Sequence, residues 1–192
     1  MQPISPFPLK SFNTFGLDAQ AKMGFVLSNE AELDTLHGSA WWSDSQPRLL
    51  IGEGSMRGRI EAQLAEDNGR RHIKLAGFRK DIPEILADID LYVLAARSPE
   101  GVPQAVLQAH AARVPVVATD VGGVREVAIH GETALCAPRN DPETLAAHIG
   151  HLLDNPNAGQ RLADNGYRLI TERYSVEMML NKMEYGGCPP YI

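Results

Sequence analysis

Short apolar segments alternate with segments of helical pattern over most of this 192-residue chain. Strands are expected at about 23–27, 48–51, 72–75, 91–95, 115–118 and 134–137. Helices are expected at about 28–36, 56–67, 82–87, 125–128, 158–173 and 175–184. Two further helices are expected, one that ends at about Ala112 and one that begins at Asp141. Because apolar strands that are each followed by a helix pair in parallel and are covered on both faces, the sequence predicts an α/β fold with a doubly wound parallel sheet.

Four loops follow the carboxyl ends of these strands, which is where open parallel sheets bind their ligands. They contain Gly52–Ser55, Gly77–Lys80, Ser98–Pro103 and Asp120–Gly123. Because the carboxyl ends of parallel strands meet at one edge of a sheet, we expect these loops on one face of the molecule. The Gly-x-Gly sequence at 52–54 fits a tight strand–helix turn as well as a phosphate cradle.

The most informative of these loops continues into a helix with the sequence SPEGVPQAVLQ, residues 98–108. Gly101 and Pro103 open this helix, and the amides of its first turn have no partners inside it, so they favour an anion such as a ligand phosphate. Glu100 and Gln108 are eight residues apart and therefore share roughly one face. A carboxylate and an amide in this arrangement suit the hydroxyls of a sugar or ribose, although an ordinary strand–loop–helix crossover explains the same residues.

Composition and charge narrow the classes of partner. A net charge of −6 and a pI near 5.5 argue against nucleic acid or an anionic membrane as the main partner. Cys136 and Cys188 match no metal-ligand spacing, and neither do the histidines, so no metal is implied. No apolar run reaches the roughly 18 residues of a transmembrane segment, and no signal sequence opens the chain, so the cytoplasm is the expected location.

Several histidines have an alternative explanation. His110, shortly after Gln108, can face a cleft, but a packing or surface position explains it more simply. His148 and His151 lie three residues apart on a helix, and a solvated face accounts for both of them.

Five strings carry a resemblance to a known family: LLIGEGSMRGRIEAQL, KLAGFRKDIPEILADIDLYVLAA, SPEGVPQAVLQAHAARVPVVATDVGGVREVAIHGETALCAP, NDPETLAAHI and RYSVE. Together they resemble the nucleotide-sugar-binding half of retaining glycosyltransferases of the GT-B fold, in particular family 4. The resemblance covers about residues 48–184. It implies the Rossmann-like half of a GT-B fold that binds a UDP- or GDP-linked sugar, with no metal and no other cofactor.

The resemblance also implies roles for individual residues. Glu100 corresponds to the first of the family's paired acids and is the catalytic residue implied, meeting the transferred sugar. The donor-binding residues implied are Gly52, Gly54, Gly77, Phe78, Arg79, Gly101, Val102, Pro103 and Gln108. Among them, Gly77–Arg79 flanks the nucleotide base, and the amides of Gly101 and Val102 hold the diphosphate. Position 108, where the family usually has a second glutamate bound to the ribose, is the uncharged Gln108.

The N-terminal quarter departs from this family. The string SFNTFGLDAQAK, followed by an acidic helix and LLIGEGS, is similar to the start of UDP-N-acetylenolpyruvoylglucosamine reductase over residues 9–55. In that flavoenzyme, the segment matched by Asn13–Gly16 opens the FAD-binding domain, and the loop matched by Gly52–Ser55 holds the flavin pyrophosphate. Met56 stands here where asparagine belongs. We hypothesise a chimera joined at Leu49–Ser55, with an N-terminal segment 1–47, a glycosyltransferase domain 48–184 and an irregular tail 185–192.

The N-terminal segment also lacks a feature that the family needs. Family members carry an arginine and a lysine after the first strand, whereas Ser-Asn-Glu-Ala-Glu follows Leu27 here. Because charged donors make the stronger hydrogen bonds to phosphate, this loss is expected to weaken donor binding. Since the acceptor-binding half is also missing from the chain, donor binding with impaired catalysis is expected.

Two alternatives remain open from sequence. In the first, the chain is a fragment of an FAD-binding reductase, and in the second it is an inert folded scaffold. Such a scaffold could associate with itself, because an unprotected sheet edge invites pairing with a second copy.

Overall fold

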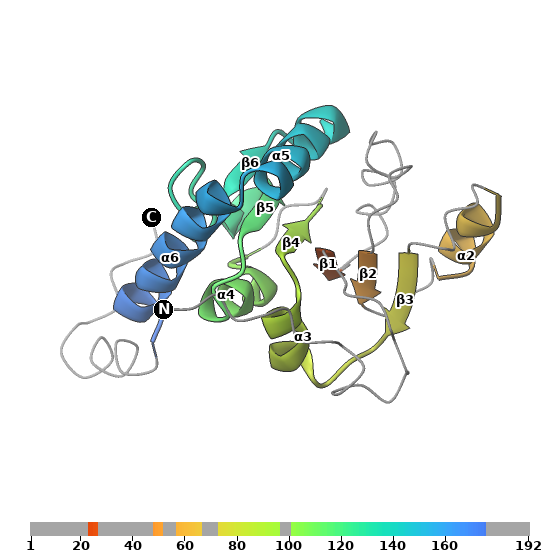
Figure 1. The fold of residues 1–192 in the computed structure, drawn as a ribbon, viewed down its shortest axis with the longest axis horizontal. Helices are drawn as coiled ribbons and strands as arrows, with labels where there is room; N and C mark the ends of the chain where they lie inside the picture. Colours follow the sequence, from red (N-terminus) through yellow and green to blue (C-terminus); the bar gives the residue numbers. More distant parts are fainter. Residues whose placement is uncertain (1–22, 27–47, 52–56, 67–72, 97–100, 176–192) are drawn as a thin grey trace.

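The computed structural model describes residues 23–26, 48–51, 57–66, 73–96 and 101–175, and these form a six-stranded parallel sheet with helices around it (Figure 1). The strands are β1 Met23–Val26, β2 Arg48–Ile51, β3 Ile73–Gly77, β4 Leu91–Leu94, β5 Val116–Thr119 and β6 Leu135–Ala137. Their order in the sheet is β3-β2-β1-β4-β5-β6. The first described strand therefore lies in the middle of the sheet and the later strands are added on both sides of it, which confirms the predicted doubly wound α/β fold.

The helices follow the predicted segments closely. They are α2 Arg57–Glu66, α3 Ile82–Asp88, α4 Gln104–Ala111, α5 Pro142–Asp154 and α6 Pro156–Arg173, and η4 Gly122–Glu126 is a 3₁₀ helix. η4 begins three residues before the predicted short helix at 125–128. The helices expected near 28–36 and 175–184 fall almost wholly outside the described residues. None of the described helices is both long enough and apolar enough to cross a membrane.

The beginning of α5 follows from its local sequence. Pro142 occupies the first turn, where its missing N–H costs nothing, and Asp141 precedes it as the N-cap. The Asp141 carboxylate accepts hydrogen bonds from the Thr144 amide at 2.9 Å and from the Thr144 hydroxyl at 2.7 Å. These bonds lower the pKa of Asp141.

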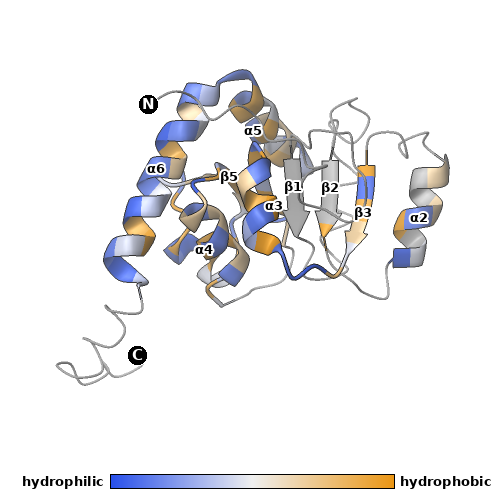
Figure 2. Ribbon diagram, turned by 60° about the horizontal axis from the view of Figure 1, so that its bottom comes forward, coloured by the Kyte–Doolittle hydropathy of each residue, from blue (hydrophilic) through white to orange (hydrophobic). Residues whose placement is uncertain are grey.

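Strand β4 is buried on both faces of the sheet, which is why its sequence is continuously apolar. Its alternate residues enter two separate cores. Tyr92 and Leu94 pack in the core that includes residues of α3, α4 and η4, whereas Leu91 and Val93 pack in the core that includes residues of α2, α5 and α6. Figure 2 shows both hydrophilic and hydrophobic segments along α6, as expected for a helix with one covered side.

The N-terminal segment contributes one of the two central strands of the sheet. β1 pairs in parallel with β4 in the register Met23↔Leu91, and with β2 in the register Met23↔Arg48. The parallel sheet thus continues from the N-terminal segment into the domain that follows it.

The outer edge of β6 is partly covered by the chain itself. The Ala137 carbonyl accepts a hydrogen bond from the amide of Asp120, the residue directly after β5. Because successive residues of a strand direct their backbone groups to opposite sides, the N–H of Cys136 points away from β5. That N–H donates to Nδ1 of His130 at 2.9 Å, and the Gly131 amide donates to the Ala134 carbonyl at 2.8 Å. At this position the edge donor is satisfied within the chain, which limits pairing with a second copy here.

Candidate functional site

Three of the predicted loops lie at the carboxyl edge of the described sheet. Gly77 ends β3, Gly101–Pro103 connects to α4 after β4, and Asp120–Gly123 follows β5. Gly77 has a φ of 64° and Gly122 a φ of 49°, so both positions favour glycine, which adopts this conformation without steric cost. The predicted Gly52–Ser55 loop and Glu100 lie outside the described residues.

The start of α4 offers unpaired backbone donors. Pro103 is its N-cap and makes no side-chain cap hydrogen bond, and the first turn carries no acidic residue. The Pro103 carbonyl accepts from the amides of Val106 and Leu107 at 3.1 and 3.3 Å. Within the described part of the chain, the amides of Gly101 and Val102 have no hydrogen-bond partner. Unpaired amides together with the helix dipole make this end of α4 electropositive.

Gln108 lies on the exposed side of α4, one turn after Gln104, which is also exposed. The other side of the helix is buried through Val106, Ala109 and His110. Gln108 is therefore accessible to a ligand, as its predicted role requires.

In the loop after β3, an apolar side chain is exposed and a charged side chain is largely buried. Phe78 is 70% exposed, which is unusual for so large an apolar group and leaves its ring available for stacking. The side chain of Arg79 is only 11% exposed, and it donates two hydrogen bonds to the Asp81 carboxylate, that from Nε at 2.7 Å. These bonds lower the pKa of Asp81. The Arg79 guanidinium is thus anchored to the start of α3 beside the loop.

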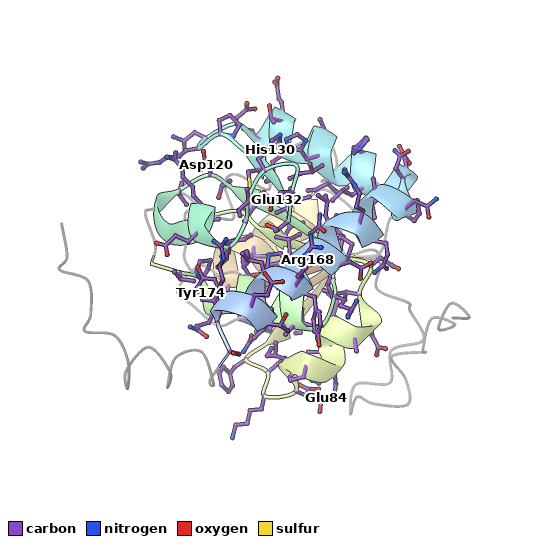
Figure 3. The ribbon with its side chains drawn as sticks, turned by 90° about the vertical axis from the view of Figure 1, so that its left-hand side faces the viewer. Glu84, Asp120, His130, Glu132, Arg168 and Tyr174 are labelled. Carbon is purple, nitrogen blue, oxygen red and sulfur yellow. The ribbon has the colours of Figure 1, made fainter. Side chains whose placement is uncertain are left out.

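A second arginine–aspartate pair closes the loop after β5. Asp120 accepts a hydrogen bond from Arg125 of η4, and its own amide donates to Ala137 at 2.8 Å. Figure 3 shows Asp120 and His130 on the α5 side of the molecule, opposite Glu84 of α3. In this region burial raises the pKa of the Cys136 thiol to about 12, so this cysteine is no nucleophile near neutral pH.

Thr119 links the ends of β4 and β5 below the site. It is fully buried, and its hydroxyl donates to the Ala96 carbonyl at 2.6 Å. This bond fixes the last described residue before segment 97–100 against the neighbouring strand. The apolar context of Val116–Thr119 indicates a buried strand, but no pattern in the sequence identifies this partner.

His110 is a packing residue, as its simpler explanation predicted. It is fully buried, and its Nε2 donates to the Val127 carbonyl at 3.0 Å. Its Nδ1 has no hydrogen-bond partner in the described part of the chain. Burial lowers the pKa of His110, so the ring stays neutral near pH 7.

The prediction for the α5 histidines holds for His151, which is exposed, and is wrong for His148. His148 is half-buried, and its ring centroid lies 5.5 Å from that of His130. Burial, with a smaller contribution from His130, lowers the pKa of His148. The two rings belong to no metal centre, because no three His, Cys, Asp or Glu side chains gather suitably among the described residues.

Comparisons with known proteins add to this geometry. Residues 43–169 match the family model described as Glycosyl transferases group 1. An uncharacterised glycosyltransferase, MJ1178 of Methanocaldococcus jannaschii, is 34% identical over 131 residues, which are 67% of this chain and 36% of that protein. The chain spans about a third of the length of such curated relatives.

Solved structures show the same fold. The crystal structure of Anabaena Alr3699/HepE in complex with UDP-glucose superimposes with a TM-score of 0.79 at 20% identity, covering 94% of this chain and 52% of that one. The C-terminal domain of a group 1 glycosyl transferase family protein (LpcC) from Francisella tularensis has a TM-score of 0.70 at 20% identity. It covers 80% of this chain and 86% of that structure.

Proposed function

The chain belongs to the group 1 glycosyl transferases, and from this premise we propose that it binds a nucleotide sugar at the carboxyl edge of its sheet. The observation that carries the proposal is the open start of α4, where the amides of Gly101 and Val102 have no partner among the described residues. A donor diphosphate supplies the acceptors that these amides lack. The helix dipole adds to the attraction without a metal ion.

Neighbouring residues are suited to bind the base, the ribose and the sugar of the donor. The exposed ring of Phe78, beside Gly77 and Arg79, is suited to stack on the nucleotide base. Gln108 can donate to and accept from ribose hydroxyls. We assign the sugar to Glu100 as the catalytic carboxylate, and we assign supporting contacts to Pro103 and to the Gly52 and Gly54 turn.

The donor class follows from the same chemistry. A UDP- or GDP-linked sugar presents a diphosphate, a ribose and a flat base, which correspond to the three kinds of group just described. HepE was crystallised in complex with UDP-glucose, and we propose a ligand of the same class for this chain.

We propose further that the chain binds its donor better than it transfers the sugar by a retaining reaction. Segment 28–32, Ser-Asn-Glu-Ala-Glu, is acidic where family 4 members carry a basic pair. Without those cations the departing diphosphate is less well stabilised in the transition state.

We also retain the chimera, with segments 1–47, 48–184 and 185–192, as a proposal about origin. Its support is that β1 and β2 pair in parallel, so a junction at Leu49–Ser55 leaves the sheet continuous. Two findings weigh against it: the family match begins earlier, at residue 43, and the likeness to HepE extends over 94% of the chain. FAD binding is the corresponding alternative function.

Isothermal titration of the chain with UDP, GDP, UDP-glucose and FAD tests the proposed function. We expect heat from at least one nucleotide or nucleotide sugar and none from FAD. Glu100→Ala should weaken binding of UDP-glucose more than binding of UDP, because Glu100 is assigned to the sugar. The matched control is Glu172→Ala on the exposed side of α6, which should change neither. Binding of FAD alone, or of no ligand, would contradict the proposal.

A further inference from the structure

Two loops at the carboxyl edge touch through a glycine that has no room for a side chain. A Cβ atom built on Gly123 would lie 2.7 Å from the carbonyl carbon of Gly101, 2.9 Å from its oxygen and 3.0 Å from the Val102 nitrogen. All three atoms belong to the peptide group that joins Gly101 to Val102. No real Cβ approaches a backbone carbon at 2.7 Å, so any other residue at 123 would force the two loops apart.

The reason for a glycine at 123 is space and not backbone conformation. Gly122 has a φ of 49°, a conformation that favours glycine, whereas Gly123 is not among the positive-φ residues. The neighbouring Gly101 is different again, because a Cβ there would meet no atom of the described chain within 4 Å. Of the two glycines in contact, the fold therefore requires Gly123 to lack a side chain and makes no such demand on Gly101.

Segment 122–128 holds α4 at both ends. Gly123 lies against the peptide group just before the helix, and the Val127 carbonyl accepts from His110 in its last turn at 3.0 Å. Between these contacts Val124 is fully buried, and its carbonyl accepts from the amides of Val127 and Ala128 at 3.1 and 2.8 Å. The segment is thus itself hydrogen-bonded, and it fixes where the start of α4 lies.

We infer that Gly123 is a positioning residue for the diphosphate of the donor, acting through the Gly101–Val102 peptide group. This inference rests on the proposed function. The missing side chain lets segment 122–128 lie directly against the peptide group, so that the unpaired amides keep one fixed position. A methyl group at 123 displaces the peptide group and hence the amides, while the nucleotide base, bound elsewhere, keeps its contacts.

The test compares Gly123→Ala with Gly150→Ala, in which the added methyl group on α5 meets nothing within 4 Å. UDP and uridine, and GDP and guanosine, are titrated into both variants and the parent, with amide resonances followed by NMR. For Gly123→Ala we expect affinity for the diphosphate to fall about tenfold and affinity for the nucleoside to change less than about twofold. Without ligand, the Gly101 and Val102 amide resonances should move in Gly123→Ala and stay in place in Gly150→Ala.

Three outcomes would overturn the inference: unchanged diphosphate affinity in Gly123→Ala, an equal loss for diphosphate and nucleoside, or loss of a cooperative thermal transition. The last would make Gly123 a requirement of folding instead of a positioning residue. If the parent chain binds no nucleotide, the proposed function is wrong. The ligand-free resonances of Gly101 and Val102 then still show whether residue 123 sets the position of the peptide group.

Discussion

The two ends of α4 are built in opposite ways. At its start, the amides of Gly101 and Val102 have no partners among the described residues, and no side chain caps the helix. At its end, the amides of Ala112, Arg113 and Val114 donate to carbonyls of the last turn at 2.9–3.0 Å. One short helix thus has two functions: its closed end contributes stability, and its open end is available to a ligand.

The closed end is also where α4 meets α6. A Cβ on Gly166 of α6 would lie 2.6 Å from Cε1 of His110, so the helices approach closely at this glycine. Arg113, just after α4, forms an ion pair with Asp164 at 2.7 Å, and its guanidinium lies 4.0 Å from the centroid of the Tyr167 ring. Changes at this end should therefore alter stability and leave nucleotide affinity alone.

Gly166→Ala should have the largest effect. The added methyl group enters the space of the buried His110 ring, and overpacking of this kind should cost about 3 kcal/mol of unfolding free energy. Urea denaturation measures the loss, and UDP titration of the folded fraction should give the affinity of the parent. Gly150→Ala is the control, and it should raise stability by up to about 1 kcal/mol, because alanine is the better helix former. A stable Gly166→Ala variant would show that the two helices are not tightly packed.

Acid should weaken the closed end through His110. Burial places the pKa of this histidine in the folded state below its ordinary value of 6.5, so the unfolded chain binds more protons in the window below 6.5. Stability is thus fully present above about pH 6.5 and falls with decreasing pH, with a slope of up to about 1.4 kcal/mol per pH unit from this group. The lowered pKa of His148 contributes with the same sign.

His110→Met isolates that contribution in urea denaturation between pH 5 and 8, because methionine fills a similar volume without titrating. The pH slope should become shallower in this variant and should persist in His151→Gln, which changes an exposed residue. An unaltered slope in His110→Met would mean that other groups cause the loss.

Arg113 combines a backbone cost with side-chain contacts. Its φ of 56° favours glycine, while its exposed side chain gains the ion pair and the cation–π contact with α6. Arg113→Ala keeps the cost and loses the contacts, so it should destabilise by about 1 kcal/mol. In Arg113→Gly the relieved backbone offsets the lost contacts, so the change should stay within about 0.5 kcal/mol. Equal losses in thermal denaturation of the two variants would show that the positive φ carries no cost.

The sequence predicts the described strands and most of the described helices within one or two residues, for identifiable physical reasons. Leu91–Leu94 is apolar at every position because both of its faces are covered, and Asp141 with Pro142 marks the start of α5 by cap chemistry that is wholly local. The accessible Gln108 and the unpaired start of α4 also follow from local sequence.

The remaining features depend on contacts between distant segments. The contact of Gly123 with Gly101 and that of His110 with Gly166 each depend on how separate elements pack. The half-buried position of His148 depends likewise on the loop that carries His130. The alternation of strands and helices does not predict that β1 lies between β2 and β4, because the strand order depends on how the crossover connections run.

Gln104→Glu tests the open end of α4 most directly, and it is expected to change stability least. Gln104→Glu places a carboxylate in the first turn of α4, where the helix dipole favours it by about 0.3–1 kcal/mol. The same carboxylate repels a bound diphosphate. Titration with UDP and GDP, beside Gln160→Glu on α6 as a control of equal charge, should show several-fold weaker binding in Gln104→Glu only, with a melting temperature at or above that of the parent. Nucleotide affinity equal to that of the parent would contradict the assignment of the diphosphate to the start of α4.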